Sequence, residues 1–170
     1  MKRKTADVRS ATHTRSIRLE RTYRATIDEV WDMWTTKEGI ESWWGPDGFA
    51  VKVRKLDLRA GGELVYAMTA VDPPQIAFMK KAGMPITTET SITFTAVVKP
   101  VRLAYLNHAD FIPGVEPYDV ATVVELSEVA EGVRLVLSFD AMHDDSWTER
   151  QTMGWQSQLD KLGQAIARLR

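Results

Sequence analysis

His108 and Asp110 are the first residues whose types and spacing suggest chemistry. If this segment is a strand, both side chains lie on one face, at the spacing that a hydrogen-bonded acid–base pair uses. Such a pair would suit a cyclase- or isomerase-like enzyme acting on an apolar substrate. The alternative is two exposed residues at the end of a strand, which is the commoner situation for these residue types. No diagnostic catalytic motif accompanies them, so the sequence leaves enzymatic activity open and assigns no catalytic residue.

A second cluster, His143 with Asp144 and Asp145, contains residue types that bind metal ions. Three consecutive residues converge poorly on one ion, because such ligands normally come from separate elements. The two aspartates also suit the positively polarised start of a helix. The sequence has no cysteine, no glycine-rich phosphate loop and no serine-nucleophile elbow. We therefore expect no metal and no cofactor.

Aromatic residues suggest a different kind of site, a ligand pocket. Pockets for small molecules are mostly apolar and carry a few polar groups, which tyrosine hydroxyls and indole N–H groups can supply. Gly154 and Gly163 fall inside a predicted helix, where each costs ~1 kcal/mol relative to alanine, and the close approach of a ligand or of the sheet would offset that cost. Ordinary burial in the core is the alternative for every aromatic residue. The candidate pocket residues are Trp43, Trp44, Tyr66, Tyr105, His108, Trp147, Gly154 and Trp155.

A sheet must position most of these residues. Alternation of apolar and polar residues predicts seven strands. They are expected at 15–24, 49–58, 62–70, 86–98, 101–109, 118–128 and 132–140. Tight connections at Gly61-Gly62, Lys99-Pro100 and Glu131-Gly132 predict that neighbours pair as antiparallel hairpins.

Helices are predicted around this sheet. Thr26 and Glu29 have the spacing of a capping box and predict a short helix from Ile27. A second short helix is expected from Thr36 or Lys37 through Trp43, and Gly45-Pro46 ends it. Residues 72–85 predict a loop or short helix that could serve as a lid.

The C-terminal segment predicts a long amphipathic helix. Ser146 and Glu149 repeat the capping-box spacing at its start. Apolar residues then recur at intervals of four and three, which predicts one buried face. These are Trp155, Leu159, Leu162, Ile166 and Leu169, whereas Gln156, Asp160, Lys161, Gln164 and Arg168 are expected in water.

This order of elements predicts an α+β helix-grip fold, in which a curved seven-stranded antiparallel sheet wraps around the long C-terminal helix. Strands ~4.8 Å apart make a sheet about 29 Å wide, whereas one helix is only ~10–12 Å across. The helix therefore cannot cover the sheet alone. We expect a ligand or large aromatic side chains to fill the remaining space.

Composition limits the partners. With 170 residues, 44% hydrophobic, the chain suits one domain at 15–170 after a mobile arm at 1–14. A net charge of −1 gives no general attraction to nucleic acid or to anionic membranes. No secretory signal or membrane-spanning segment is recognisable, so we expect a cytoplasmic protein without membrane insertion.

Two motifs carry a family resemblance. Trp43-Trp44-Gly45-Pro46 followed by Gly48-Phe49, and Leu56-Asp57-Leu58-Arg59 before Gly61-Gly62, resemble the bacterial relatives of the heat-shock ATPase activator. That family belongs to the START-like, polyketide-cyclase (SRPBCC) superfamily. The similarity extends from Ala25-Thr26-Ile27-Asp28-Glu29-Val30-Trp31 to Gly154-Trp155 and Leu159-Asp160-Lys161-Leu162, which covers most of the chain.

The resemblance implies a helix-grip fold with an apolar cavity. The superfamily includes lipid carriers, cyclases, oxygenase domains and the co-chaperone, so the fold alone does not select a function. We expect an apolar or amphipathic small molecule as the partner. The alternative is a protein-interaction module that binds a chaperone, which is the weaker expectation because the separate N-terminal domain of the eukaryotic activator is not found here.

Overall fold

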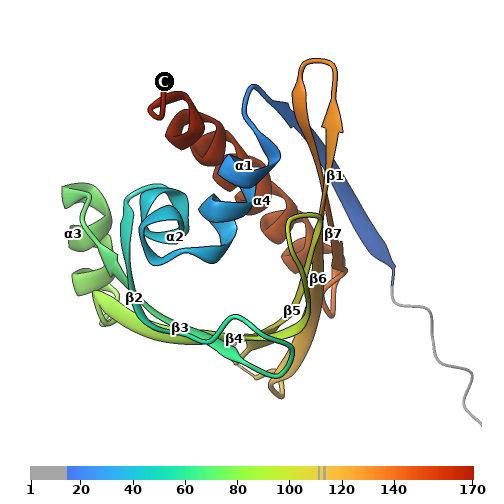
Figure 1. Ribbon diagram of the computed structural model, residues 1–170. Coiled ribbons are helices and arrows are strands. Elements are labelled where there is room, and N and C mark those ends of the chain that lie inside the picture. Colours follow the sequence, from blue (N-terminus) through green and yellow to red (C-terminus); the bar gives the residue numbers. More distant parts are fainter. Residues whose placement is uncertain (1–14, 111, 113) are drawn as a thin grey trace, which may run out of the picture.

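The computed structural model describes residues 15–110, 112 and 114–170. A seven-stranded antiparallel sheet curves around a long C-terminal helix; two short helices lie inside this curve and a third lies at one margin of the sheet (Figure 1). The strands are β1 Ser16–Tyr23, β2 Phe49–Leu56, β3 Glu63–Ala70, β4 Thr87–Val98, β5 Arg102–Ala109, β6 Tyr118–Val129 and β7 Gly132–Asp140. The helices are α1 Ile27–Thr35, α2 Lys37–Trp43, α3 Pro73–Lys81 and α4 Asp145–Ala167. The predicted helix-grip fold is confirmed, and the predicted arm lies outside the described residues.

The strand order is β1-β7-β6-β5-β4-β3-β2, so β2 to β7 form a meander and β1 joins β7. Every pair of neighbours is antiparallel. The chain leaves one edge of the sheet after β1, crosses its concave side through α1 and α2, and enters the opposite edge at β2 (Figure 1). This crossing places the short helices inside the curve of the sheet.

The first two helices begin where the sequence predicts. Thr26 Oγ1 accepts from the Glu29 amide at 3.2 Å, and Glu29 Oε1 accepts from the Thr26 amide at 2.9 Å. This reciprocal bonding satisfies two amides that the helix itself cannot pair. Thr36 ends α1 and caps α2, because its hydroxyl accepts from the Gly39 amide at 3.0 Å.

The predicted cap of α4 is wrong. Asp144, not Ser146, is the N-cap: its backbone is extended, and its carboxylate accepts from the Trp147 amide at 2.8 Å. Asp144 and Trp147 have the same separation as a cap and its amide partner in a capping box, and a carboxylate fills the role as well as a hydroxyl does. Ser146 lies within the first turn, where its backbone is already helical.

The buried face of α4 is largely as predicted. Trp155, Leu159, Leu162 and Ile166 are buried against the sheet and the short helices. Leu169 lies beyond the end of the helix and is 52% exposed, so its predicted burial is wrong. Lys161 also departs from the expected solvated face: its ammonium donates to the Gly45 carbonyl at 2.9 Å, and burial lowers its pKa.

Residues 72–85 contain the helix α3, which lies at the end of β2 and β3 (Figure 1). Only Met79 of this helix is buried, while Phe78 is 62% exposed. The segment is attached through the Gly48 carbonyl, which accepts from the Val71 amide at 2.8 Å. Its action as a lid stays a prediction. Within the described part of the chain, no helix has the length and apolar character needed to span a membrane.

Candidate binding site on the inner face of the sheet

Six aromatic residues from α1, α2, α4, β3 and β5 meet inside the curve of the sheet. We call Trp34, Trp43, Trp44, Trp155, Tyr66 and Tyr105 the aromatic cluster. The Trp44 ring is central: its centroid lies 5.5 Å from that of Trp34, 6.1 Å from that of Tyr66 and 6.2 Å from that of Tyr105. Five of the eight predicted pocket residues, Trp44 among them, are thus brought together. Trp34 was not predicted, although the apolar spacing of α1 placed it on the buried face of that helix.

The adjacent residues Trp43 and Trp44 have different roles. The Trp43 indole donates to the Met33 carbonyl at 2.9 Å, which joins α2 to α1. The Trp44 indole instead bonds the Tyr66 hydroxyl of the sheet. Trp43 is therefore a packing residue between the short helices, whereas Trp44 reaches the strands.

The turn after Trp44 is held by α4. The Gly45 amide donates to Gln158 Oε1 at 3.3 Å, and the Gly45 carbonyl accepts from Lys161. Ser157 Oγ donates to Asp47 Oδ2 at 3.2 Å. Gly45 has a positive φ of 91°, and a Cβ there would come within 3.0 Å of Val51 Cγ2. The Trp-Trp-Gly-Pro motif thus fixes the end of α2 between α4 and β2.

Polar residues interrupt the apolar inner face of the middle strands. Tyr105 of β5 pairs with Phe94 of β4 on one side and with Thr122 of β6 on the other. Thr122 is 1% exposed and accepts from Asn107 Nδ2 at 3.2 Å. Directly paired residues of antiparallel strands project to the same face. Tyr105, Asn107 and Thr122 therefore form a polar group inside the curve of the sheet.

Three buried polar atoms, on α1, β5 and α4, have no hydrogen-bond partner within the protein. They are Tyr105 Oη, Trp34 Nε1 and Gln151 Oε1. Tyr105 and Trp34 are each 1% exposed. Burial raises the pKa of the Tyr105 hydroxyl well above its ordinary value. Burial also raises the pKa of Tyr66, but the hydrogen bond from the Trp44 indole opposes this rise. A buried polar atom without a partner costs free energy, so these atoms suit hydrogen bonds to a bound molecule.

The helices approach the sheet mainly at its margins. Close backbone approaches run from α2 to β2, from α4 to β1, and from α1 to β6 and β7. At β3 and β5 the Trp44 ring packs against Tyr66 and Tyr105. The centre of the inner face is therefore covered by side chains rather than by helix backbone.

One side of α4 borders open space. A Cβ placed at Gly154 would meet no atom within 4 Å, whereas one at Gly163 would lie 3.3 Å from the Tyr23 ring. Close packing thus explains Gly163 but not Gly154. Trp147 precedes Gly154 by seven residues and Gln151 precedes it by three, so the three residues lie along one side of the helix. The Arg150 guanidinium lies over the Trp147 ring, 5.2 Å from the ring centroid.

His108 lies apart from the other candidates, on the outer face of the sheet. Its Nδ1 lies 2.6 Å from Asp119 Oδ1 of β6, and its Nε2 lies 3.2 Å from Thr93 Oγ1 of β4. The partner of the histidine is therefore Asp119 rather than the predicted Asp110. His108 and Asp110 both line a shallow depression of about 260 Å³, together with Glu63 and Glu89.

His143 forms its contacts with nearby residues of the same end of the sheet. Its Nδ1 lies 2.8 Å from the Tyr118 hydroxyl, and the neighbouring Asp144 caps α4. Among residues 15–110, 112 and 114–170, no group of three histidine, cysteine, aspartate or glutamate side chains is arranged to hold a metal ion.

Comparisons with known proteins agree with this architecture. Residues 24–167 match the family model described as Activator of Hsp90 ATPase homolog 1-like protein. A crystal structure of a Chromobacterium violaceum protein superposes with a TM-score of 0.72 at 23% identity, covering 89% of this chain and 96% of the other. An AHSA1-like protein from Aeromonas hydrophila gives 0.71 at 22% identity, with 91% and 94% covered. The AHSA1 protein from Silicibacter pomeroyi gives 0.68 at 21% identity, with 92% and 100% covered.

No curated protein matches the sequence significantly. The solved structures are below 25% identity and establish the fold, whereas the family model extends over most of the sequence. From Arg24, the residue after β1, to the end of α4, the chain belongs to the Activator of Hsp90 ATPase homolog 1-like family.

Proposed function

We propose that the protein binds an apolar or amphipathic small molecule between the inner face of the middle strands and α4. The observation that carries this proposal is the pair of unpartnered polar atoms, Tyr105 Oη and Trp34 Nε1, buried within the aromatic cluster. A core built only for stability would gain by replacing such groups with apolar ones. Small-molecule sites, in contrast, combine apolar walls with a few polar groups.

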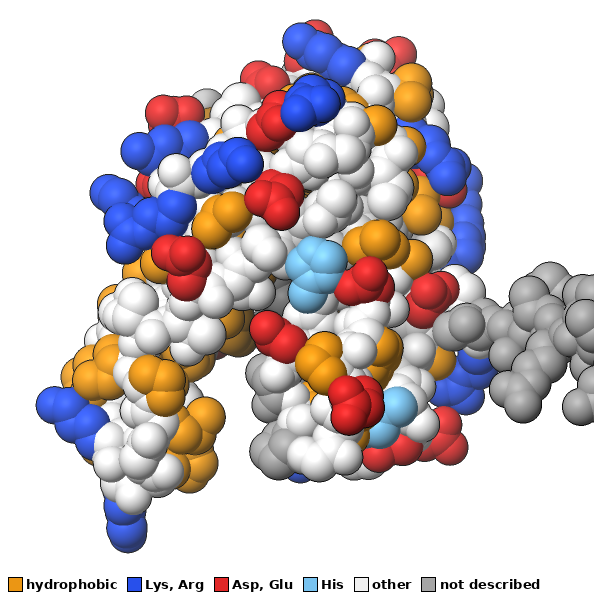
Figure 2. All heavy atoms as spheres, turned by 90° about the horizontal axis from the view of Figure 1, so that it is seen from below, with side chains coloured by type: hydrophobic (Ala, Val, Ile, Leu, Met, Phe, Trp, Pro, Cys, Tyr) orange, Lys and Arg blue, Asp and Glu red, His pale blue; other side chains and the backbone are white. Residues whose placement is uncertain are grey.

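In this proposal the ligand reaches the site at one end of the sheet. β4 and β5 pair from Ile92 and Asn107 onward, whereas the first residues of β4 pair with β3 alone. Thr90 therefore projects to the inner face at a position that β5 does not flank, opposite Tyr66. At this side Figure 2 shows the surface notched between the lobe that carries α3 and the opposite lobe. The open space beside Gly154 favours entry along α4.

The family name suggests an alternative, a module that binds a chaperone ATPase. The solved structures named above share the fold but differ from this chain at most positions, so the family name alone does not assign chaperone binding to this chain. The ligand site has the stronger support, because it accounts for the unpartnered polar atoms. A cytoplasmic location is part of the proposal, since a chain without cysteine needs no oxidising compartment to fold.

Binding is tested by titrating the purified protein with fatty alcohols, sterols and aromatic polyketides while tryptophan emission is recorded. A ligand of the folded protein should change the emission saturably and raise the melting temperature. Native mass spectrometry of freshly purified protein would reveal a co-purified molecule.

We expect Gly154→Leu to obstruct entry along α4 and to keep the fold, since leucine favours helix over glycine and the side chain enters open space. We expect it to weaken binding at least about tenfold. Gln156→Leu is the matched control, because it adds the same side chain at an exposed position of α4. Equal affinities of the two variants, or no saturable ligand at all, would contradict the proposed site.

A further inference from the structure

Starting from the proposed function, on which this step rests, we propose that the ligand is uncharged and presents an oxygen atom to Trp34 Nε1–H or to the Tyr105 hydroxyl. This assigns a ligand class: long-chain or polycyclic alcohols, ketones and esters, rather than free carboxylates or amines.

The interior offers no charge to pair with an ion. Among the described residues, the buried polar side chains other than the aromatic ones are Thr35, Thr122 and Thr148, and all three are neutral. Asn107, which shares the inner face with Tyr105, is a neutral amide. An ionised ligand would therefore lose its hydration shell without gaining a counter-ion, and that exchange is strongly unfavourable.

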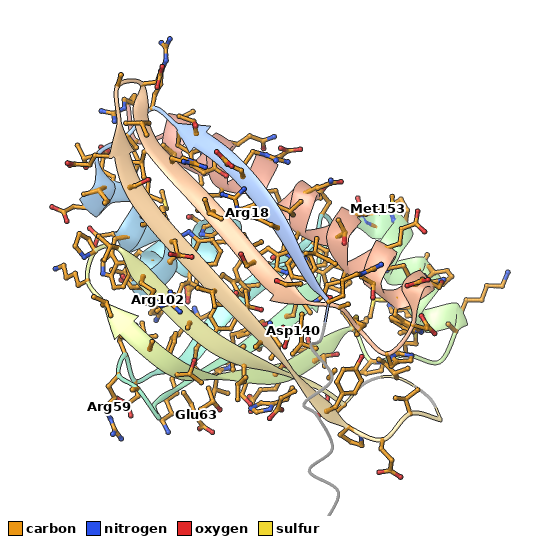
Figure 3. All side chains as sticks on the ribbon, turned by 90° about the vertical axis from the view of Figure 1, so that its right-hand side faces the viewer. Arg18, Arg59, Glu63, Arg102, Asp140 and Met153 are labelled. Carbon is orange, nitrogen blue, oxygen red and sulfur yellow. The ribbon has the colours of Figure 1, made fainter. Side chains whose placement is uncertain are left out.

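The cations lie elsewhere and have partners. Arg18 and Arg102 stand on the outer face of the sheet, where Figure 3 shows them directed away from α4, and each lies near a glutamate. Arg21 reaches Asp160 of α4 at the β1 edge, at 3.9 Å. Lys161 is bonded to the Gly45 carbonyl. Arg18, Arg102 and Arg21 thus pair with acids outside the aromatic cluster, and Lys161, whose acceptor is the residue after Trp44, already has a partner.

The polarity of the interior points the same way. The pKa of Tyr105 is raised well above its ordinary value, chiefly by burial and further by Tyr66. An environment that suppresses ionisation of a phenol also disfavours a buried carboxylate, because the phenolate and the carboxylate are both anions. The aromatic cluster is thus a poor host for free fatty acids at neutral pH.

The two unpartnered atoms further define the ligand. An indole N–H can only donate, while a phenol hydroxyl can donate or accept. A ligand oxygen that accepts from Trp34 and contacts Tyr105 would satisfy both, whereas a pure hydrocarbon would leave both unpaired. Both rings pack against Trp44, so the two groups belong to one region of the interior.

Decanol, decanoate and decylamine test the charge preference, because they share a chain length and differ in the head group. Calorimetry at pH 7.5, below the concentrations at which the probes self-associate, should give decanol at least about tenfold tighter binding than either ion. Decanoate should gain affinity as the pH falls towards the pKa of its carboxyl group. Tighter or equal binding of decanoate at pH 7.5 would overturn the inference while leaving the binding function intact.

Tyr105→Phe tests the hydrogen bond. Loss of one hydroxyl should weaken decanol binding about two- to tenfold, the range for one neutral hydrogen bond. Tyr118→Phe is the matched control, because its hydroxyl bonds His143 away from the aromatic cluster, and it should leave decanol affinity unchanged. Equal affinities of Tyr105→Phe, Trp34→Phe and the unmodified protein for decanol would refute the assigned contacts. If no probe in the broad panel saturates and nothing co-purifies, the proposed function itself fails, and the ligand class with it.

Discussion

Removing the Tyr105 hydroxyl should stabilise the ligand-free protein, which is the reverse of the usual effect of a core substitution. Tyr105 is 1% exposed, and its hydroxyl has no hydrogen-bond partner. An unsatisfied buried polar group costs about 1–3 kcal/mol, while the phenyl ring of phenylalanine keeps the packing. We expect Tyr105→Phe to raise the free energy of unfolding by about 1 kcal/mol. For a chain of this length that corresponds to a melting temperature about 2–4 °C higher.

Tyr23→Phe is the matched comparison. The Tyr23 hydroxyl is also buried, but it donates to the Leu159 carbonyl of α4 at 2.9 Å. Its loss should lower the free energy of unfolding by about 0.5–1.5 kcal/mol, the net worth of one hydrogen bond. Urea unfolding followed by tryptophan fluorescence measures both variants. A destabilised Tyr105→Phe variant, equal in sign and size to Tyr23→Phe, would refute the reasoning, because it would mean that the Tyr105 hydroxyl is paired in the folded protein.

Three further predictions concern the stability of α4 and the loss of folding stability at alkaline pH. Asp144→Ala should cost about 0.5–2 kcal/mol by removing the cap, whereas Ser146→Ala should change stability by less than about 0.5 kcal/mol; chemical denaturation that ranks them the other way would return the cap to the serine. Gly154→Ala should stabilise the fold by about 0.5–1 kcal/mol, as measured by thermal melting, while Gly163→Ala should gain less because its Cβ presses on a tyrosine ring. Because burial raises the pKa of Tyr105, the unfolded chain loses this proton first, so stability should decline as the pH rises above about 10. The decline should be shallower in Tyr105→Phe, and identical slopes would contradict the assigned burial.

The family motif has a structural explanation that is independent of any ligand. Trp43 joins the two short helices, the positive φ of Gly45 turns the chain away from α2, and α4 holds the turn through Gln158 and Lys161. This arrangement places Trp44 against the sheet. The motif therefore builds the wall of the candidate site, whether or not each relative binds the same kind of molecule.

The fold was accessible from the sequence because its elements are specified locally. Alternation of apolar residues predicts the strands to within one or two residues, and hairpin turns join most of them in chain order. The cap of α1 depends on residues three positions apart, so it too was predicted. The cap of α4 was not, because two local candidates compete there and only the backbone conformation of Asp144 decides between them.

The site depended on contacts between residues far apart in the chain. Tyrosines and tryptophans could be proposed as pocket residues from their chemistry alone, but which of them meet depends on where the short helices dock. Periodicity places His108 and Asp110 on one face, yet it cannot say whether that face is the inner or the outer one. The histidine pairs with Asp119 because two strands separated by a loop lie in register. The sequence by itself determined the order of the elements and their apolar faces, since these follow from neighbouring residues. The tertiary structure alone decided which polar atoms are buried without partners, because hydrogen bonding and burial depend on the whole surroundings of each atom.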